Sequence, residues 1–391
     1  MFISSSLKQP SGGFLFLLCT WLTVHTTIVA ADSVKENQQF EGLIREPLML
    51  SVTLPDGKPA LLDAFVTRPA GFKRWPVALI TNGTVGTAEF DRWEMNPNRM
   101  SGTALTFARH GYAAVVVLRE GYGYSSGGAE YTGGTCVRPQ HDLAKKRDTE
   151  DLLGALSAIR LQPWASRNEA ILAGMSAGGF GVLAAGAGRP SGIKAIINFD
   201  GGRGAADNAS VCDKAGLLKT FAAMGAASHA PSLWLYSLND RLFPPLTGIS
   251  FFNSYASAGG SGRFVVMPPY GINGHVFMES APESFWWGPV AKFLREKGLP
   301  YREEVAVSRK KMPFPPSLNN AAGTSAFREY QSAQLYEKAF AMDSSGDWGV
   351  SYWARSAPEA AATALRNCQK HLKNTWGKCR IYAVNNAVVQ D

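Results

Sequence analysis

The sequence has few cysteines and none of the usual metal or phosphate spacings. Its 391 residues include five cysteines, and they hold no Cys-x-x-Cys pair, no His-Glu-x-x-His motif and no Gly-x-x-x-x-Gly-Lys loop. Such motifs supply zinc ligands or surround the phosphates of a nucleotide. We therefore predict a protein that needs no metal and no cofactor.

Charge is also sparse, at 18% of residues, and no region carries a strong excess of one sign. Lysine and arginine together number 39 against 31 for aspartate and glutamate, and they are scattered apart from the short runs 145–147 and 309–311. Scattered positive charge mainly affects solubility and weak attraction to anionic surfaces. We predict no nucleic-acid partner.

No apolar run is both long and uninterrupted enough to predict a stable membrane span. The N-terminal apolar stretch, residues 14–29, follows Lys8 and is interrupted by threonines. It ends in Val29-Ala30-Ala31, small residues of the kind that a signal peptidase reads. We predict a signal peptide over residues 1–31, cleavage near Asp32, and a secreted or periplasmic protein. A single membrane anchor is the alternative, which the polar interruptions disfavour.

The cysteines that remain after this cleavage are Cys136, Cys212, Cys368 and Cys379. An even number in an oxidising compartment favours disulfides. We expect Cys368–Cys379 to close a short loop near the C-terminus, and Cys136–Cys212 to join two loops beyond strand ends. Four free thiols and pairs that cross between these two regions are the alternatives.

Residues 32–300 have the pattern of an α/β domain. Residues 48–67 alternate around Pro55-Asp56-Gly57, which predicts an antiparallel hairpin. Short apolar runs then alternate with helical stretches, and continuous runs of this kind are typical of a mostly parallel, doubly wound sheet that is buried on both faces. One expected helix begins at Pro289 and ends at Gly298. The expected strands are Val77–Thr81, Ala113–Leu118, Ala170–Ala173, Ile193–Phe199, Ser232–Ser237 and Phe264–Met267.

The pattern changes after Pro300. Residues 301–327 are rich in proline and asparagine and show little periodicity, so we expect a linker there. Residues 328–391 predict a small ββαβ module, with a hairpin around residues 344–346, a helix opened by the capping-box residues 356–359 and a last strand after Cys379. A unit of this size buries little core, and a disulfide would stabilise it.

Gly174-Met175-Ser176-Ala177-Gly178 is the strongest local motif. It follows the apolar run 170–173 and opens a helix, which is the context of a nucleophile elbow. That sharp turn raises a serine oxygen above the sheet, where the helix N-terminus stabilises negative charge. We predict that Ser176 is a nucleophile.

A serine needs a base to accept its proton and an acid to orient that base. In this type of fold the chain order is serine, acid, histidine. His275 follows the strand that ends at Met267, at the edge where the site must lie, whereas His229 leads into a strand and suits a surface role. Asp240 lies just past another strand and is the predicted acid, with Asp200 as its rival.

The transition state of acyl transfer also needs two donors for its oxyanion. The N–H of Ala177, directly after the serine, is one candidate. The second donor should come from the loop after residue 81, where Thr84 is the candidate and Val85 the alternative.

Residues 45–299 resemble the dienelactone hydrolase-like branch of the α/β-hydrolases. The matching segments are residues 82–83, 119–123, 174–179, 234–240 and 268–275. The resemblance implies a Ser176, Asp240 and His275 triad and the hydrolysis of small esters or lactones. Dienelactone hydrolases proper use a cysteine nucleophile where this chain has serine, which weakens the inference of their named lactone substrate. Residues 336–391 are similar to a small module of unassigned function found in exported bacterial proteins.

These observations predict an exported serine hydrolase that cleaves small-molecule carboxylic esters or lactones through an acyl-enzyme on Ser176. A serine peptidase of the prolyl-oligopeptidase or X-Pro type is the nearest alternative, although this sequence places no propeller-length segment before the domain. A binding protein on a non-catalytic hydrolase scaffold is the alternative from another class, and the complete serine, acid and histidine set argues against it.

Overall fold

A nine-stranded sheet in the order β1-β2-β3-β5-β4-β6-β7-β8-β9 forms the centre of the larger part of the chain. The strands β1 to β3 and β5 pair antiparallel, and every pairing from β5 through β4 to β9 is parallel. The strands are β1 (Gln38–Phe40), β2 (Leu43–Thr53), β3 (Pro59–Pro69), β4 (Trp75–Thr81), β5 (Ala113–Val117), β6 (Ala165–Met175), β7 (Ile193–Phe199), β8 (Ser232–Ser237) and β9 (Gly262–Met267).

This computed structural model describes residues 38–40, 42–84, 92–127, 136–205, 210–306, 312–318, 320–372 and 376–389. The predicted signal peptide, residues 1–31, and the alternative oxyanion donor Val85 lie outside the described residues. Within the described part of the chain, no helix is long and apolar enough to cross a membrane.

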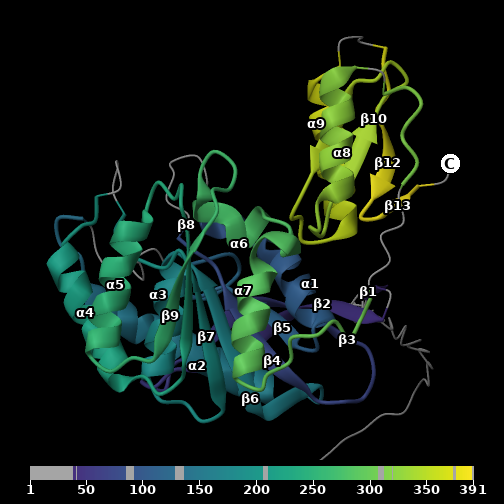
Figure 1. Ribbon diagram of the computed structural model, residues 1–391. Helices are drawn as coiled ribbons and strands as arrows, with labels where there is room; N and C mark the ends of the chain where they lie inside the picture. The colour runs from purple at the N-terminus through teal and green to yellow at the C-terminus, as the bar shows by residue number, and fades with distance from the viewer. Residues whose placement is uncertain are drawn as a thin grey trace, which may run out of the picture. The chain divides into compact units, whose positions relative to one another are not determined.

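Helices cover both faces of the sheet (Figure 1). They are η1 (Arg92–Glu94), η2 (Pro97–Met100), α1 (Ser101–Arg109), α2 (His141–Arg160), α3 (Ala177–Ala187), α4 (Lys214–Ala227), α5 (Pro245–Ser257), η5 (Gly274–Val276), α6 (Phe277–Ser280) and α7 (Glu283–Glu296). The two faces form separate cores. Val77 and Leu79 of β4 belong to the core under α2 to α5, whereas Ala78 and Ile80 belong to the core under α1 and α7. Because both faces are buried, the central strands read as continuous apolar runs.

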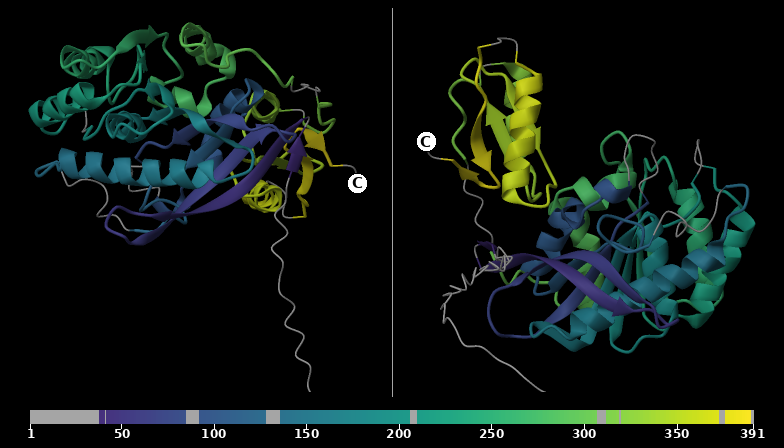
Figure 2. Two further views of the ribbon diagram at one scale, coloured as in Figure 1. Left: turned by 90° about the horizontal axis from the view of Figure 1, so that it is seen from below. Right: turned by 180° about the vertical axis from the view of Figure 1, so that it is seen from behind.

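The predicted hairpin is formed by β2 and β3, which pair over their whole length from Leu43↔Pro69 to Thr53↔Pro59. Figure 2 shows it as a long twisted ribbon, coloured purple. The hairpin joins the parallel strands through the pairing of β3 with β5. The sheet is therefore the mostly parallel, doubly wound sheet that the sequence predicts.

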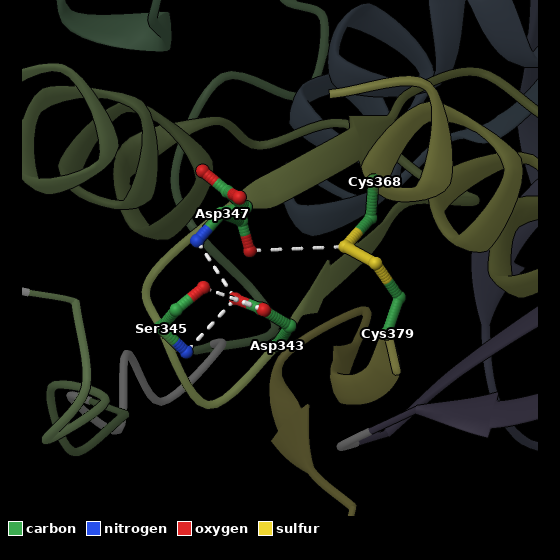
Figure 3. Close-up of a disulfide and its surroundings, with 5 residues drawn as sticks. All are labelled: Asp343, Ser345, Asp347, Cys368 and Cys379. Atoms are coloured by element: carbon green, nitrogen blue, oxygen red, sulfur yellow. Dashed lines mark hydrogen bonds between the residues drawn. A yellow bond between two sulfur atoms is a disulfide. The ribbon is translucent and has the colours of Figure 1, made fainter. Parts of the chain in front are cut away.

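The C-terminal region has its own four-stranded antiparallel sheet in the order β11-β10-β12-β13. Its elements are α8 (Ala321–Ser332), β10 (Ala339–Met342), β11 (Trp348–Ser351), α9 (Ala357–Lys370), β12 (Arg380–Val384) and β13 (Ala387–Val388). The predicted ββαβ order is present as β10, β11, α9 and β12. Cys368 at the end of α9 is bonded to Cys379 just before β12, and the Cys368 sulfur lies 3.7 Å from the carbonyl oxygen of Asp347, beside the turn that contains Asp343 and Ser345 (Figure 3).

Two sequence expectations for helices are wrong. The segment expected as a linker over residues 301–327 contains the start of α8, because Asn320 caps the helix by accepting a hydrogen bond from the Gly323 N–H at 2.7 Å. The last helix of the larger part, α7, begins at Glu283 rather than Pro289, and Pro289 lies inside it.

Charged side chains connect β2 and β3 with the C-terminal region. Arg45 on β2 donates to Glu337 at 2.6 Å, and both side chains are almost completely buried. Arg355, between β11 and α9, donates to Asp63 on β3 at 2.8 Å. A buried ion pair of this kind is costly to break, because one charge is then left without its partner.

Candidate active site

Ser176 occupies the sharp turn between β6 and α3. Its backbone angles, φ 55° and ψ −122°, are strained for a residue with a side chain. The turn is held because the Ser176 N–H donates to Phe199 O on β7 at 3.0 Å, and the Phe180 N–H donates to Ser176 O at 3.1 Å. Ser176 is buried at 8% exposure, at the carboxyl edge of the sheet where ligands of open α/β sheets bind.

The glycines around Ser176 allow this turn to pack. A Cβ added at Gly174 would lie 2.3 Å from Gly178 O, and one added at Gly178 would lie 2.3 Å from Asn82 O. A Cβ at Gly179 would lie 2.2 Å from Asn198 Oδ1. Any larger residue at these three positions would collide with backbone or a buried side chain.

Asp240 and His275 come together from the loops that follow β8 and β9. His275 Nδ1 lies 2.9 Å from Asp240 Oδ2, and both residues are buried. Asp240 Oδ1 accepts hydrogen bonds from the N–H groups of Leu242 at 2.7 Å and Phe243 at 2.9 Å. The carboxylate is therefore fixed from both sides, and it orients the imidazole.

Burial alone would raise the pKa of Asp240, but the hydrogen bond and charge of His275 and the N–H groups of Phe243 and Leu242 outweigh it. The pKa of Asp240 is consequently below its ordinary value, and the group is ionised at neutral pH. An ionised partner on Nδ1 favours the imidazole tautomer whose Nε2 is free to accept a proton.

Two asparagines that sequence reasoning missed connect the acid loop with the histidine loop. Asn273 Oδ1 accepts from the N–H of Arg241 at 3.0 Å and from the N–H of His275 at 3.2 Å. Asn239 accepts from the Tyr270 N–H at 2.9 Å, and its amide donates to Gly271 O at 3.0 Å. Loop asparagines often bond to backbone in this way, but the sequence does not reveal that these bonds join two loops about 35 residues apart.

The loop after β4 lies directly beside the serine. A Cβ added at Gly83 would be 3.0 Å from the Cβ of Ser176. Thr84 follows at an exposed position, and its Oγ1 accepts a hydrogen bond from the Tyr122 hydroxyl at 3.3 Å. Ala177 begins α3, and the first N–H groups of a helix have no partner within the helix. The loop and the helix start thus flank the serine.

Arg119, just after β5, holds this loop from inside the protein and was not assigned a role from the sequence. Its Nη1 donates to Thr81 Oγ1 at 2.8 Å and to Asn82 O at 2.7 Å, while its Nε donates to Asp148 on α2 at 3.0 Å. The guanidinium is 3% exposed, so these charge-assisted bonds are made away from water.

The rival residues occupy other positions. Asp200 is completely buried at the end of β7, where its Oδ1 accepts the Ser237 N–H at 2.9 Å, and the His275 ring bonds to Asp240 instead. His229 is exposed in the loop that leads into β8, at the opposite edge of the sheet.

Among the residues that the structure describes, one cluster has a spacing that could hold a cation. It consists of Asp200, Asp240 and His275. Their ligand atoms lie within 4.8 Å of one another. Asp240 already uses both carboxylate oxygens to accept hydrogen bonds, one of them from the His275 ring. These hydrogen bonds of Asp240 favour a hydrogen-bonded cluster of side chains over a cation site.

Cys136 and Cys212 are joined, with Cα atoms 5.0 Å apart, and Cys368 is joined to Cys379. These are the pairs expected from the sequence. The first disulfide connects the segment before α2 to the segment before α4, at the side of the sheet that carries the serine.

Part of the chain is similar to a known protein family. A family described as X-Pro dipeptidyl-peptidase (S15 family) matches residues 56–230, which is less than half of the chain. No curated protein matches the sequence.

Solved structures of hydrolases are similar at low identity. The acylaminoacyl peptidase of Pyrococcus horikoshii is 19% identical, with a TM-score of 0.45 over 66% of this chain and 43% of its own. The acetyl xylan esterase of Paenibacillus sp. R4 is 18% identical, with a TM-score of 0.47 over 67% of this chain and 86% of its own. A protein of Klebsiella pneumoniae described as a dienelactone hydrolase is 15% identical, with a TM-score of 0.42 over 66% and 98%. The chain thus spans less than half the length of the acylaminoacyl peptidases that it matches.

The order and direction of the strands, with a strained serine at the turn from β6 to α3, are those of an α/β-hydrolase. The chain has the α/β-hydrolase fold, with a separate small antiparallel sheet at its C-terminal end.

Proposed function

We propose that this protein is an exported serine hydrolase that cleaves small carboxylic esters through an acyl-enzyme on Ser176. The observation that carries the proposal is the hydrogen-bonded pair of Asp240 and His275, on loops at the same sheet edge as a serine in a strained strand-to-helix turn. A surface serine or a capping aspartate would not require this arrangement.

In the first half of the reaction, His275 accepts the Ser176 proton while the serine oxygen attacks the ester carbonyl. Asp240 stabilises the imidazolium that forms and keeps its tautomer. The Ala177 and Thr84 N–H groups stabilise the oxyanion, and Arg119 holds the backbone of the second donor's loop. The tetrahedral intermediate collapses, and His275 returns the proton to the leaving alcohol.

In the second half, a water attacks the acyl-enzyme carbonyl and His275 takes its proton. Collapse of the new tetrahedral intermediate breaks the bond to the serine oxygen, releases the carboxylic acid and restores the serine hydroxyl. Every proton passes through a group of this chain or through water, so the sequence of steps needs no cofactor.

Export is supported by the sequence of residues 1–31 and by the two disulfides, because such bonds persist in oxidising compartments. Both disulfides would be absent from a protein held reduced in the cytosol. Mass spectrometry of protein from the culture medium or periplasm should give an N-terminus near Asp32.

The second candidate is a peptidase that removes Xaa-Pro dipeptides, and the family match over residues 56–230 favours it. The fold and the triad are common to both reactions, so the substrates decide. We expect turnover of p-nitrophenyl esters of short acyl chains at a kcat/KM well above that of Xaa-Pro p-nitroanilides. The reverse order would assign the protein to the peptidases.

A further inference from the structure

Asp200 is a buried carboxyl group that the proposed mechanism leaves without a role. It follows the carboxyl end of β7 and lies beside Asp240, which follows β8. Its φ is 46°, and it is completely buried. Its backbone N–H donates to Leu235 O at 2.8 Å, and its Oδ1 accepts the Ser237 N–H at 2.9 Å. The backbone and one carboxyl oxygen are thus firmly held.

The other oxygen, Oδ2, is buried and has no hydrogen-bond donor among the described residues. A buried acceptor left without a donor is costly, and an ionised one is more so. The group close to it is the carboxylate of Asp240, whose ligand atoms lie within 4.8 Å of those of Asp200 and His275. Two carboxylates cannot both remain charged at this distance away from water.

One proton on Asp200 would give its Oδ2 a hydrogen-bond partner and would remove the repulsion between the two carboxylates. Asp240 accepts three hydrogen bonds, from Leu242, Phe243 and His275, and a carboxylate has room for about four. A protonated Asp200 would donate the fourth bond and would no longer have an unpaired oxygen.

We propose that Asp200 is a positioning residue that acts as a neutral carboxylic acid, donating a hydrogen bond from its protonated Oδ2 to Asp240. It thereby fixes the carboxylate that orients His275 and spreads part of its charge. This inference rests on the proposed function, because only a working triad gives the positioning a consequence for the reaction.

The electrostatic surroundings agree with this assignment. Burial raises the pKa of Asp200 well above its ordinary value, and the nearby charge of Asp240 raises it further. The other titratable groups that face it are His275, through Asp240, and Tyr236, which donates to Gly201 O. Burial raises the pKa of Tyr236 well above its ordinary value, so this phenol stays neutral as well.

Infrared difference spectroscopy tests the proton without any assay of activity. The spectrum of the full-length wild-type protein minus that of Asp200→Asn at pH 7 should contain the carbonyl stretch of a protonated carboxylic acid. Asp343→Asn is the matched control, because Asp343 is buried but accepts hydrogen bonds from Ser345 and Asp347 as a carboxylate. Loss of a carboxylate band in Asp200→Asn, with no carboxylic-acid band, would overturn the proposal even if the protein has no esterase activity.

The pH profile of ester hydrolysis tests the positioning role. Asparagine tolerates a positive φ, accepts the Ser237 N–H and donates to Asp240, so Asp200→Asn should keep most of the activity and the wild-type acid limb of kcat/KM. Asp200→Gly tolerates the same φ but removes the donor. It should lower kcat roughly tenfold, the effect of losing one hydrogen bond to a charged group, and move the acid limb to higher pH.

The upward move is expected because an Asp240 with one donor fewer holds the His275 proton more tightly. If Asp200 were ionised, Asp200→Asn would remove a negative charge and move the acid limb to lower pH, which would contradict the proposal. An Asp200→Gly variant with unchanged kcat and pH profile would also contradict it. Covalent labelling of Ser176 is a separate measurement, so failure of the proposed function and failure of this inference give different results.

Discussion

The serine edge of the large sheet and the C-terminal region are stabilised in different ways. At the serine edge, the loops extend from a sheet with a large core on each face, and Asn239, Asn273 and Arg119 hold these loops through hydrogen bonds. In its described residues the C-terminal region has two small apolar clusters, one on each side of its four-stranded sheet, and a disulfide links the end of α9 to the start of β12.

This contrast predicts where a substitution should affect activity and where it should affect stability. Polar groups at the serine edge lie on loops of a sheet that large cores stabilise, so their loss should lower activity with little change in the free energy of unfolding. In the C-terminal region little apolar surface is available to offset chain entropy, so covalent and ionic links should matter more for stability.

The largest expected effect is on activity alone. Ser176→Ala should lower kcat for esters by about 10⁴- to 10⁶-fold, since loss of the nucleophile disables the whole triad. The melting temperature should not fall, because the strained φ of 55° is no harder for alanine to adopt than for serine. A comparison of kcat with the unfolding midpoint checks both. Retained activity in a folded variant would remove Ser176 from the site.

Asp240→Asn should have the next largest effect on activity. It should lower kcat about 10⁴-fold, because an amide that donates to Nδ1 leaves the imidazole in the wrong tautomer. Asp200→Asn is the matched control, one strand away and equally buried. If Asp200→Asn were the more damaging of the two, the acid of the triad would be Asp200.

The disulfide of the C-terminal region should act on stability. Replacing Cys368 and Cys379 with serine should lower the unfolding free energy by roughly 3 kcal/mol, the chain-entropy value for their sequence separation of 11. Ester turnover by the folded variant at low temperature should be close to that of the wild type. Denaturant unfolding and initial rates measured on one preparation provide the comparison, and a large loss of kcat without loss of stability would contradict it.

The smallest expected effects are opposite responses to pH in the two regions. Burial raises the pKa of Asp151, which accepts the Glu120 N–H, to about 7. In the C-terminal region, burial lowers the pKa of Lys338 to about 7. Asp151 binds its proton more tightly when folded, so its contribution should make stability fall as pH rises from about 4 to 7.

Lys338 binds its proton less tightly when folded, so its contribution should make stability rise as pH increases from about 7 to 10. Asp151→Asn should flatten the acid-side slope and Lys338→Met the alkaline-side slope of unfolding midpoint against pH. Each variant is the control for the other. A variant that changed both slopes equally would show that the two groups are not independent.

Much of the fold, the sharp turn at Ser176 and the contact between Asp240 and His275 could be predicted from the sequence. The elbow is readable because three glycines and an apolar strand surround one serine, and each glycine proves to face an atom within 2.3 Å of an added Cβ. The buried strands can be predicted because successive residues of β4 face opposite sides of the sheet and both sides are buried, which gives a continuous apolar run.

Other features depend on contacts that local patterns do not encode. The position of Pro289 is typical of a first helical turn, but α7 begins six residues earlier because Trp286 and Val290 are buried on the same face of one helix. The hydrogen bond from Arg119 to Asn82 and the proximity of Asp200 to Asp240 arise where neighbouring parallel strands end at one edge. Such pairs require the strand order, which only the folded structure supplies.

Whether Ser176 is the nucleophile is tested most directly by identifying the residue that a fluorophosphonate labels. The wild-type protein should gain one phosphonyl group, and digestion followed by mass spectrometry should place it on the peptide that contains Ser176. Asp240→Asn should label much more slowly at the same residue, and Ser176→Ala should not label. Labelling at another residue, or no labelling of the folded wild-type protein, would contradict the account.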